Sequence, residues 1–355
     1  MDPSSRRRGT GTAPPAALGV TVTPGVCAAI CTHNRTNQLR RALRSLREQT
    51  REPAEILVVD NAPGSPASMN LVRDEFPGVR YVMEPVPGLD FARNRALRET
   101  SREIVAFIDD DVVAGPGWAE AIRDVFRESG RIAVCTGKVE ALSLETEGQR
   151  LFEANGGFAR GNERIRLPAD RKKRRLHGMP VPLIAWSISI GSGCSLAVRR
   201  RTILDLGGFD EALDMGPSLP GGGDLDIHWR VLDAGHEIVY DPSVQARHEH
   251  RREVEASVNQ IIDHHRSLIA MLAKAAVSPC STGRTGVLAF LAWRLVKPGV
   301  RLLSRLAGRD PLPAWALVRM WGNCWRGLGS YAAARRLAER RREAGYGLCA
   351  EAVDE

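Results

Sequence analysis

The sequence predicts an α/β protein in which a mainly parallel sheet carries helices on both faces and a helical C-terminal extension follows. Two observations support this fold class. From residue 26 to residue 140, short apolar runs alternate with amphipathic helical runs, a pattern typical of βαβ units whose strands are buried on both faces. From residue 285 to residue 345, Trp, Leu and Arg recur at roughly helical spacing, which indicates amphipathic helices.

The first part of the chain pairs each predicted strand with a predicted helix. Several of these strands end in polar residues, and the ligands of such sheets bind beyond the carboxyl ends of the strands. The pairs are "VCAAICTH" with "QLRRALRSLREQ", "AEILVVDN" with "SMNLVRDEF", "VRYVMEP" with "FARNRALRET", and "EIVAFIDDD" with "WAEAIRDVF", after which "IAVCTGKVE" is a further strand. The polar ends "THNR", "VVDN" and "FIDDD" therefore mark the expected pocket.

The second part of the chain begins with a break in this pattern. Residues 140–185 are rich in Gly, Arg and Asn and include the basic run "RKKRR", so we expect irregular structure there. Ordered segments then resume. They are a strand in "SISIGSGCSLAVRR", a helix and turn in "RTILDLGGFDEALD", a helix opened by the glycines of "GGGDLDIHWRVLDAG", a strand in "HEIVYDP", and a helix over 254–276. Gly235 stands at the position of a helix stop.

Composition limits the partners and the compartment. The chain has 355 residues with 50 Lys and Arg against 42 Asp and Glu, a net charge of +8. This excess fits sugar nucleotides, phospholipid-linked substrates, a membrane surface or nucleic acid, and does not choose among them. Seven cysteines without zinc-site spacing fit a reduced cytoplasm. The longest apolar stretch, 285–303, is interrupted by Arg294, Lys297 and Pro298, so we expect no membrane span.

Three consecutive aspartates, Asp109 to Asp111, follow the apolar run 104–108. Like charges at the end of a buried strand are costly to keep ionised without a partner. Mg²⁺ and Mn²⁺ take oxygen ligands and commonly bind through one or two carboxylates while substrate phosphates complete the shell. In an extended chain Asp109 and Asp111 would face one side and Asp110 the other. The alternative is a solvated acidic turn at the start of the next helix.

Six motifs in order resemble the family 2 glycosyltransferases, inverting enzymes with a GT-A type fold. They are "AAICTHNR", "ILVVDNAP", "PGLDFARNRAL", "FIDDDV", "GGFDE" and "GGGDLDIHWRVLDAGHEIVYDP". The resemblance covers about two thirds of the chain and implies a three-layer α/β/α, Rossmann-like domain. We therefore predict a disordered basic leader over 1–24, a GT-A domain over 25–277 with its nucleotide-binding half at 25–139 and its acceptor-binding half at 140–277, and a helical extension over 278–355.

The resemblance also implies a set of site residues on the donor side. Asp111 would bind Mn²⁺ or Mg²⁺, and His248 would be a further ligand of the metal or diphosphate, although histidine pairs of this spacing are more often surface residues. Asp60 would contact the base, since a carboxylate can accept the N3–H of uracil. The implied nucleotide-binding residues are Thr32, Asn34, Arg35, Asp60, Arg93, Asn94, Asp109 and Asp110.

The acceptor side follows from the same resemblance. Direct displacement needs one carboxylate that takes the proton of the attacking hydroxyl, and Asp224 occupies the family position of that base. Asp224 could instead be the N-cap of its helix. Gly223 departs from the pattern, because the family has an acidic residue there. The implied acceptor-binding residues are Gly191, Ser192, Gly193, Asp210 and Asp226.

The predicted function is metal-dependent, inverting sugar transfer from a nucleotide-diphosphate donor, with UDP-sugar as the expected donor, to a hydroxyl of a glycan, lipid-linked or natural-product acceptor. The alternatives are an inactive relative that acts as a scaffold, suggested by Gly223, and a nucleotidyltransferase, although "CTHNRTNQ" lacks the glycines of a phosphate loop. An aromatic content of 5% and acidic strand ends argue against nucleic acid. The C-terminal helices either pack on the main domain or contact the inner face of a membrane peripherally.

Overall fold

The computed structural model describes residues 23–170, 175–176, 179–279 and 283–351. Nearly all of the predicted leader over 1–24, and residues 171–174 of the basic run "RKKRR", lie outside the described residues. The described residues form a nine-stranded sheet in the order β3-β2-β1-β4-β10-β6-β11-β5, and β7 pairs with β11. Its strands are β1 (Thr23–Thr32), β2 (Glu55–Asn61), β3 (Arg80–Glu84), β4 (Arg102–Ile108), β5 (Val112–Ala114), β6 (Ile132–Ala141), β7 (Ile165–Leu167), β10 (Ser195–Arg199) and β11 (Glu237–His248).

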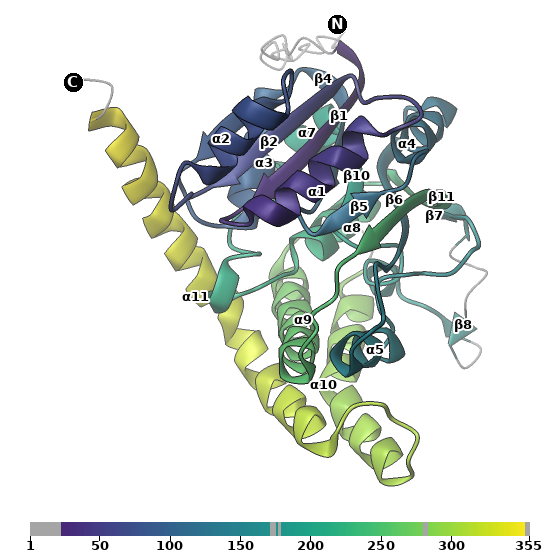
Figure 1. The fold of residues 1–355 in the computed structure, drawn as a ribbon. Coiled ribbons are helices and arrows are strands. Elements are labelled where there is room, and N and C mark those ends of the chain that lie inside the picture. The colour runs from purple at the N-terminus through teal and green to yellow at the C-terminus, as the bar shows by residue number, and fades with distance from the viewer. Residues whose placement is uncertain (1–22, 171–174, 177–178, 280–282, 352–355) are drawn as a thin grey trace, which may run out of the picture.

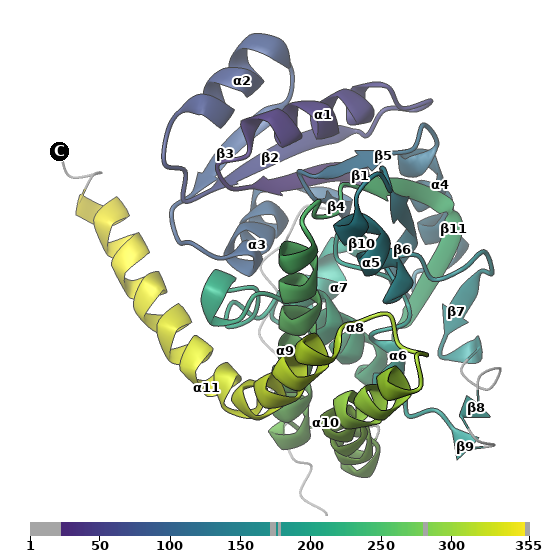
Figure 2. The same ribbon diagram turned by 60° about the horizontal axis from the view of Figure 1, so that its bottom comes forward.

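The predicted α/β class is confirmed. Strands β3, β2, β1 and β4 run parallel, and β6 and β11 are also parallel to each other. Alternate residues of β1 face opposite layers, since Val26, Ala28 and Ile30 pack in one core and Cys27 and Ala29 in the other. Helices therefore cover both faces (Figures 1 and 2).

The two helical layers contain different helices. The core beside Val26 and Ile30 includes α1 (Thr36–Arg47), α2 (Ala67–Glu75) and α4 (Trp118–Glu128). The opposite core includes α3 (Leu89–Glu99), α7 (Arg200–Asp205) and α8 (Gly223–Asp233).

Two predicted segments differ in the structure. Residues 140–185 are more regular than expected, since they contain α5 (Glu147–Ala154), β7, a two-stranded pair of β8 (Arg175–Leu176) and β9 (Met179–Pro180), and α6 (Leu183–Trp186). A capping box between Thr146 and Gln149 starts α5. The strand expected over 187–200 is shorter, because only β10 pairs, and it runs antiparallel between β4 and β6.

The C-terminal helices pack against the main domain. Helices α10 (Arg284–Leu306) and α11 (Ala314–Glu351) pack against α9 (Val254–Val277) below the sheet in the view of Figure 1. Helix α11 continues as a long helix toward the C-terminus. Gly327 of α11 lies against α9, where a Cβ atom would be 2.9 Å from the Arg266 carbonyl oxygen. In the part of the chain that is described, no helix is both long and apolar enough to cross a bilayer.

Candidate active site

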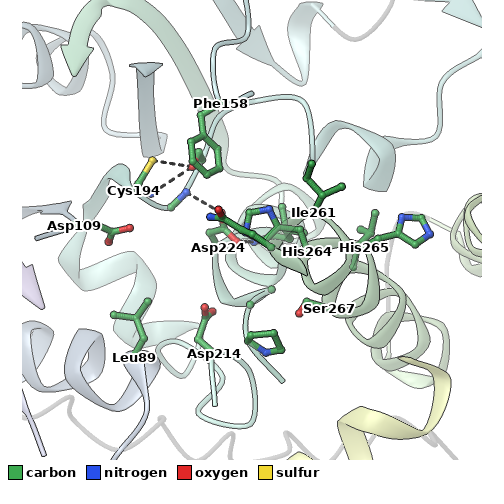
Figure 3. Close-up of a pocket in the computed structure, with 18 of the residues that line it drawn as sticks. Leu89, Asp109, Phe158, Cys194, Asp214, Asp224, Ile261, His264, His265 and Ser267 are labelled. Atoms are coloured by element: carbon green, nitrogen blue, oxygen red, sulfur yellow. Dashed lines mark hydrogen bonds between the residues drawn. The ribbon is translucent and has the colours of Figure 1, made fainter. Parts of the chain in front are cut away.

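A cavity of about 1130 Å³ lies at the carboxyl ends of the parallel strands. Its walls include residues that follow β1, β2 and β4, the start of α8, and inward-facing residues of α9 and α10. Asp109, Asp214 and Asp224 project toward this space from different elements (Figure 3). The polar residues at the strand ends, which the sequence marks as the expected pocket, thus line the same cavity as Asp224.

The three consecutive aspartates form a turn rather than an extended chain. The Val112 N–H donates to the Asp109 carbonyl (3.1 Å), and this turn lets all three side chains line the cavity. Our expectation that Asp110 faces the other side was therefore wrong. Asp110 is buried, and it accepts hydrogen bonds from Thr32 Oγ1 (2.8 Å) and Arg35 Nη1 (3.1 Å). Arg35 also donates to Asp111 Oδ2 (3.2 Å).

Asp109 lies in the same turn and is short of positive charge. Burial, together with the neighbouring Asp111 and Asp110, raises its pKa to about 8 against the opposing effect of Arg93. Burial likewise raises the pKa of Asp111, although Arg35 and Arg251 oppose it. A cation that enters this turn would lower both values, because it favours the ionised carboxylates.

A chain of hydrogen bonds orients His248 toward Asp111. His250 Nε2 lies 2.6 Å from Glu153 Oε1, and His250 Nδ1 lies 2.9 Å from His248 Nδ1. If His250 Nε2–H donates to the carboxylate, His250 Nδ1 is the acceptor for His248 Nδ1–H. The remaining lone pair, on His248 Nε2, then lies 3.4 Å from Asp111 Oδ1. Burial, His250 and Arg251 lower the pKa of His248 to about 3, so the ring is neutral.

This arrangement fits a divalent cation. In this tautomer the His248 Nε2 lone pair faces the Asp111 carboxylate, and a cation between the two would be bound by both. In many metal sites a carboxylate accepts a hydrogen bond from the ligating histidine and so fixes the orientation of its ring. Glu153 does this for His248 indirectly, because His250 lies between them in the hydrogen-bond chain. No group of three or more His, Cys, Asp or Glu side chains forms a metal cluster within the described residues, so phosphate oxygens would have to complete the shell.

Arg93 of α3 is a buried cation among carboxylates. It donates to Asp90 Oδ1 at 3.0 Å, and its Nη1 lies 3.6 Å from Asp214 Oδ2. Burial opposes its charge, but Asp90, Asp214 and Asp109 raise its pKa, so Arg93 stays charged. Asp214 is held at φ 51°, which costs backbone strain in a non-glycine residue. No local pattern around Asp214 indicates a site residue, because its place depends on α3 and α8.

Asp224 is fixed at the first turn of α8. Its Oδ2 accepts from the Gly193 N–H and its Oδ1 from the Leu225 N–H, both at 2.8 Å. These bonds hold the carboxylate in one orientation at the cavity wall. A Cβ atom on Gly193 would lie 3.0 Å from Asp224 Cβ and 3.1 Å from Arg93 Nη2, so glycine allows Arg93 and Asp224 to come close.

Gly223, the departure from the family pattern, has a steric reason. A Cβ atom there would lie 2.0 Å from Asp90 Oδ2 and 2.5 Å from Asp214 Oδ2. The Gly223 N–H instead donates to Asp214 Oδ2 at 2.7 Å. Two carboxylates from other elements thus fill the space that a side chain on residue 223 would need.

The predicted nucleotide-binding residues divide into two groups. Thr32, Arg35, Arg93, Asp109 and Asp110 line the cavity, together with the predicted metal ligands Asp111 and His248.

The other three do not line it. Asp60 is fully buried and accepts from Tyr81 Oη (2.9 Å). Asn34 accepts from the Gly64 N–H (2.8 Å), and Asn94 bonds the Phe209 backbone at both its amide atoms. Contacts of these three side chains with a nucleotide stay predictions.

The predicted acceptor residues divide in the same way. Gly191, Ser192 and Gly193 line the cavity. Asp210 and Asp226 lie outside its lining and share Lys274, whose Nζ is 2.5 Å from Asp210 Oδ2 and 2.6 Å from Asp226 Oδ1.

Several residues of the cavity wall were not predicted. His264 of α9 lies beside Asp224 (Figure 3), and α10 contributes three cations that are described below. The sequences of α9 and α10 have helical periodicity, but periodicity alone does not predict which face of a helix lines a cavity.

Comparison with known proteins gives consistent matches. The family model for glycosyl transferase family 2 matches residues 27–205. The chain is 27% identical over 234 residues to the pre-mycofactocin glycosyltransferase of Mycobacterium tuberculosis, which covers 64% of this chain and 43% of that protein. It is 28% identical over 251 residues to the succinoglycan biosynthesis protein ExoM of Rhizobium meliloti, 69% of each. A mannosyltransferase from Pyrobaculum calidifontis, solved with GDP-Man and Mn²⁺, superposes with a TM-score of 0.52 at 19% identity, over 87% of this chain and 86% of that one.

Proposed function

The chain belongs to glycosyl transferase family 2, and from this premise we propose that it transfers a sugar from a nucleotide-diphosphate donor to an acceptor hydroxyl with inversion. One observation carries the proposal, namely that the aspartate turn at 109–111 and the separate carboxylate of Asp224 line a single cavity. A donor diphosphate at the turn would place its sugar between these two acidic groups. Direct displacement needs this separation of leaving group and base.

Asp224 is the proposed base. Its two backbone N–H donors fix its orientation, and its remaining lone pairs can accept the proton of an acceptor hydroxyl. The hydroxyl oxygen then forms the new bond to the anomeric carbon on the face opposite the departing diphosphate. One displacement of this kind inverts the anomeric configuration.

Arg35 and Arg93 are the proposed cations of the donor end. Both line the cavity, and each lies within 3.2 Å of an aspartate carboxylate, so either guanidinium can turn part of its fork toward a phosphate oxygen. Asp111 and His248 would hold Mn²⁺ or Mg²⁺. Such an ion, when bound, neutralises the charge that develops on the leaving diphosphate.

The nucleotide of the donor is the next part of the proposal. The resemblance predicts a uridine diphosphate sugar, with Asp60 at the base. Asp60 is turned toward Tyr81, so this contact would need a movement of the side chain. GDP-Man is the alternative donor, because the mannosyltransferase of similar fold was solved with it.

Two aspartate variants test the proposal. We expect Asp224→Asn to abolish release of nucleoside diphosphate from a panel of UDP- and GDP-sugars while Mn²⁺-dependent nucleotide binding, measured by calorimetry, is retained. Asp111→Asn should instead lose the Mn²⁺ dependence of binding. Asp124→Asn on α4, where Asp124 is exposed and pairs with Arg127, is the matched control and should keep both properties. Full turnover in Asp224→Asn would overturn the assignment of the base.

A further inference from the structure

Three cations of α10 line the cavity. Arg294, Lys297 and Arg301 are spaced i, i+3 and i+7, so they share one face of the helix. Within the described part of the chain, Arg301 alone of the three has a bonded acidic partner, Asp310, at 2.6 and 2.8 Å. Among the residues that the structure describes, no hydrogen bond or ion pair involves the Lys297 ammonium group.

Arg294 is held in place by neutral groups. Pro298 has no N–H, so the Arg294 carbonyl loses its partner within the helix. His265 Nε2 donates to this carbonyl at 3.2 Å, and His265 Nδ1 therefore accepts from Arg294 Nη2 at 3.0 Å. Burial and the Arg294 charge lower the pKa of His265 to about 3, so the ring adds no charge. Arg294 Nε is buried without a hydrogen-bond partner.

Arg294, Lys297 and Arg301, here called the cluster, therefore carry a net positive charge that Asp310 neutralises only in part. Burial lowers the pKa of Arg294 to about 10. Burial, together with Arg294 and Arg301, lowers the pKa of Lys297 to about 8. Arg294 and Lys297 are half-buried, and removing cations from water without balancing charge is costly; an anion bound between them would offset that cost.

The position of the cluster relates it to the proposed base. His265, which touches Arg294, lies on the far side of Asp224 from Asp109 (Figure 3). An anion at the cluster would therefore be separate from a donor diphosphate at the aspartate turn. A molecule that spans from the cluster to Asp224 would occupy the acceptor end of the cavity.

The outer face of α10 has the opposite character. Trp293, Val296, Val300 and Leu303 are between 43% and 69% exposed. A surface helix usually turns its apolar side inward and its charges outward, whereas α10 presents charges to the cavity and apolar side chains outside. This reversal favours an anionic group in the cavity and an apolar environment around the helix.

We propose that Arg294, Lys297 and Arg301 form a phosphate-binding subsite at the acceptor end, so that the acceptor carries a phosphate group. The inference rests on the proposed function, since it names the class of acceptor for the same cavity. Three cations on one helix face match the spread charge of a phosphate. The phosphate belongs either to a soluble phosphorylated acceptor or to an isoprenoid-phosphate-linked glycan, and in both the hydroxyl that meets Asp224 lies on the part of the molecule beyond the phosphate.

The reactivity of Lys297 provides a direct test. The intact protein is acylated at pH 8 with an amine reagent, and the rate at Lys297 is followed by peptide mass spectrometry. Inorganic phosphate and farnesyl phosphate are the two probes, each with and without UDP and Mn²⁺. A bound phosphate that raises the pKa by one unit would slow labelling about fivefold, because the neutral fraction falls by that factor. Lys138, which pairs with Glu140, is the internal control and should not change.

Variants make the test independent of labelling. Farnesyl phosphate should raise the melting temperature of the wild type and of Arg319→Gln, an exposed arginine of α11, but not that of Arg294→Gln. Protection by farnesyl phosphate at a tenfold lower concentration than inorganic phosphate would identify a lipid source, and equal protection a soluble one. Unchanged Lys297 labelling with both probes overturns the subsite. If Lys297 labelling is unchanged but sugar transfer is observed, the proposed function stands and the phosphate subsite is wrong. If a phosphate slows labelling of Lys297 but no nucleotide sugar is turned over, the proposed function is wrong instead.

Discussion

Gly223 offers a quantitative test of the packing around the proposed base. The change Gly223→Ala adds one methyl group at a place where its carbon would lie 2.0 Å from Asp90 Oδ2 and 2.5 Å from Asp214 Oδ2. Contact distances between such atoms are normally about 3.5 Å or more. Asp90 would have to withdraw, although it is fully buried and bonded to Arg93 at 3.0 Å.

The expected cost combines three effects. Overpacking of a dense interior costs about 1–3 kcal/mol. Disturbing a charged hydrogen bond, here between Asp90 and Arg93, costs about 1.5–3 kcal/mol. Alanine recovers about 0.5–1 kcal/mol over glycine in a helix, so we expect a net loss of about 2–5 kcal/mol in the free energy of unfolding. Gly223→Asp should lose more, because it adds a third carboxylate beside a single buried arginine.

Urea unfolding followed by tryptophan fluorescence measures this loss. Gly322→Ala and Gly329→Ala on α11 are matched controls, because an added Cβ meets no atom within 4 Å at either position, and both should be as stable as the wild type or slightly more stable. Combining Gly223→Asp with Asp214→Gly should recover part of the loss, since the carboxylate is then moved rather than added. A Gly223→Ala protein as stable as Gly322→Ala would refute the reasoning.

Three further predictions follow from other contacts. Glu153→Gln should weaken Mn²⁺ binding about 10- to 100-fold in calorimetry, because it removes the carboxylate behind His250 and His248; unchanged affinity would contradict the proposed hydrogen-bond chain. Ser195→Ala should cost about 1–3 kcal/mol in the free energy of unfolding, since it leaves the buried Trp118 Nε1–H without its acceptor at 2.9 Å. Ser330→Ala, at a half-exposed position of α11 where the hydroxyl donates to the Arg326 carbonyl of the same helix, should cost little. Gly327→Ala should separate α11 from α9, because its Cβ would meet Arg266 O and Ile269 at 2.9 Å; proteolysis within α11 should become faster, and an unchanged cleavage rate would argue against tight packing there.

The sequence alone was sufficient to predict the parallel strands and the order of the motifs along the chain. Periodic apolar runs predicted the parallel strands, and the aspartates at 109–111 and Asp224 do line one cavity. The direction of β10 could not be predicted, because a buried strand has the same apolar pattern in a parallel and an antiparallel pair.

The orientation of individual side chains also could not be predicted from the local sequence pattern. Asp60 and Asn94 lie on predicted elements but turn toward Tyr81 and Phe209, and this choice depends on residues distant in the chain. Helix α5 is a different case, since the Thr146 and Gln149 capping box was present in the sequence and predicts the helix start that we missed.

The family match ends at residue 205, whereas Asp224, His248 and the cations of α10 come later in the chain. Asp224 and His248 belong to α8 and β11 of the sheet domain, whereas the cations of α10 form a wall of the cavity that comes from a helical appendage and can diverge on its own. If α10 lines the acceptor end as proposed, exchange of that appendage between relatives would change the acceptor end of the cavity while the aspartate turn at 109–111 stays in place. Two chains alike over 27–205 need not, for this reason, modify the same molecule.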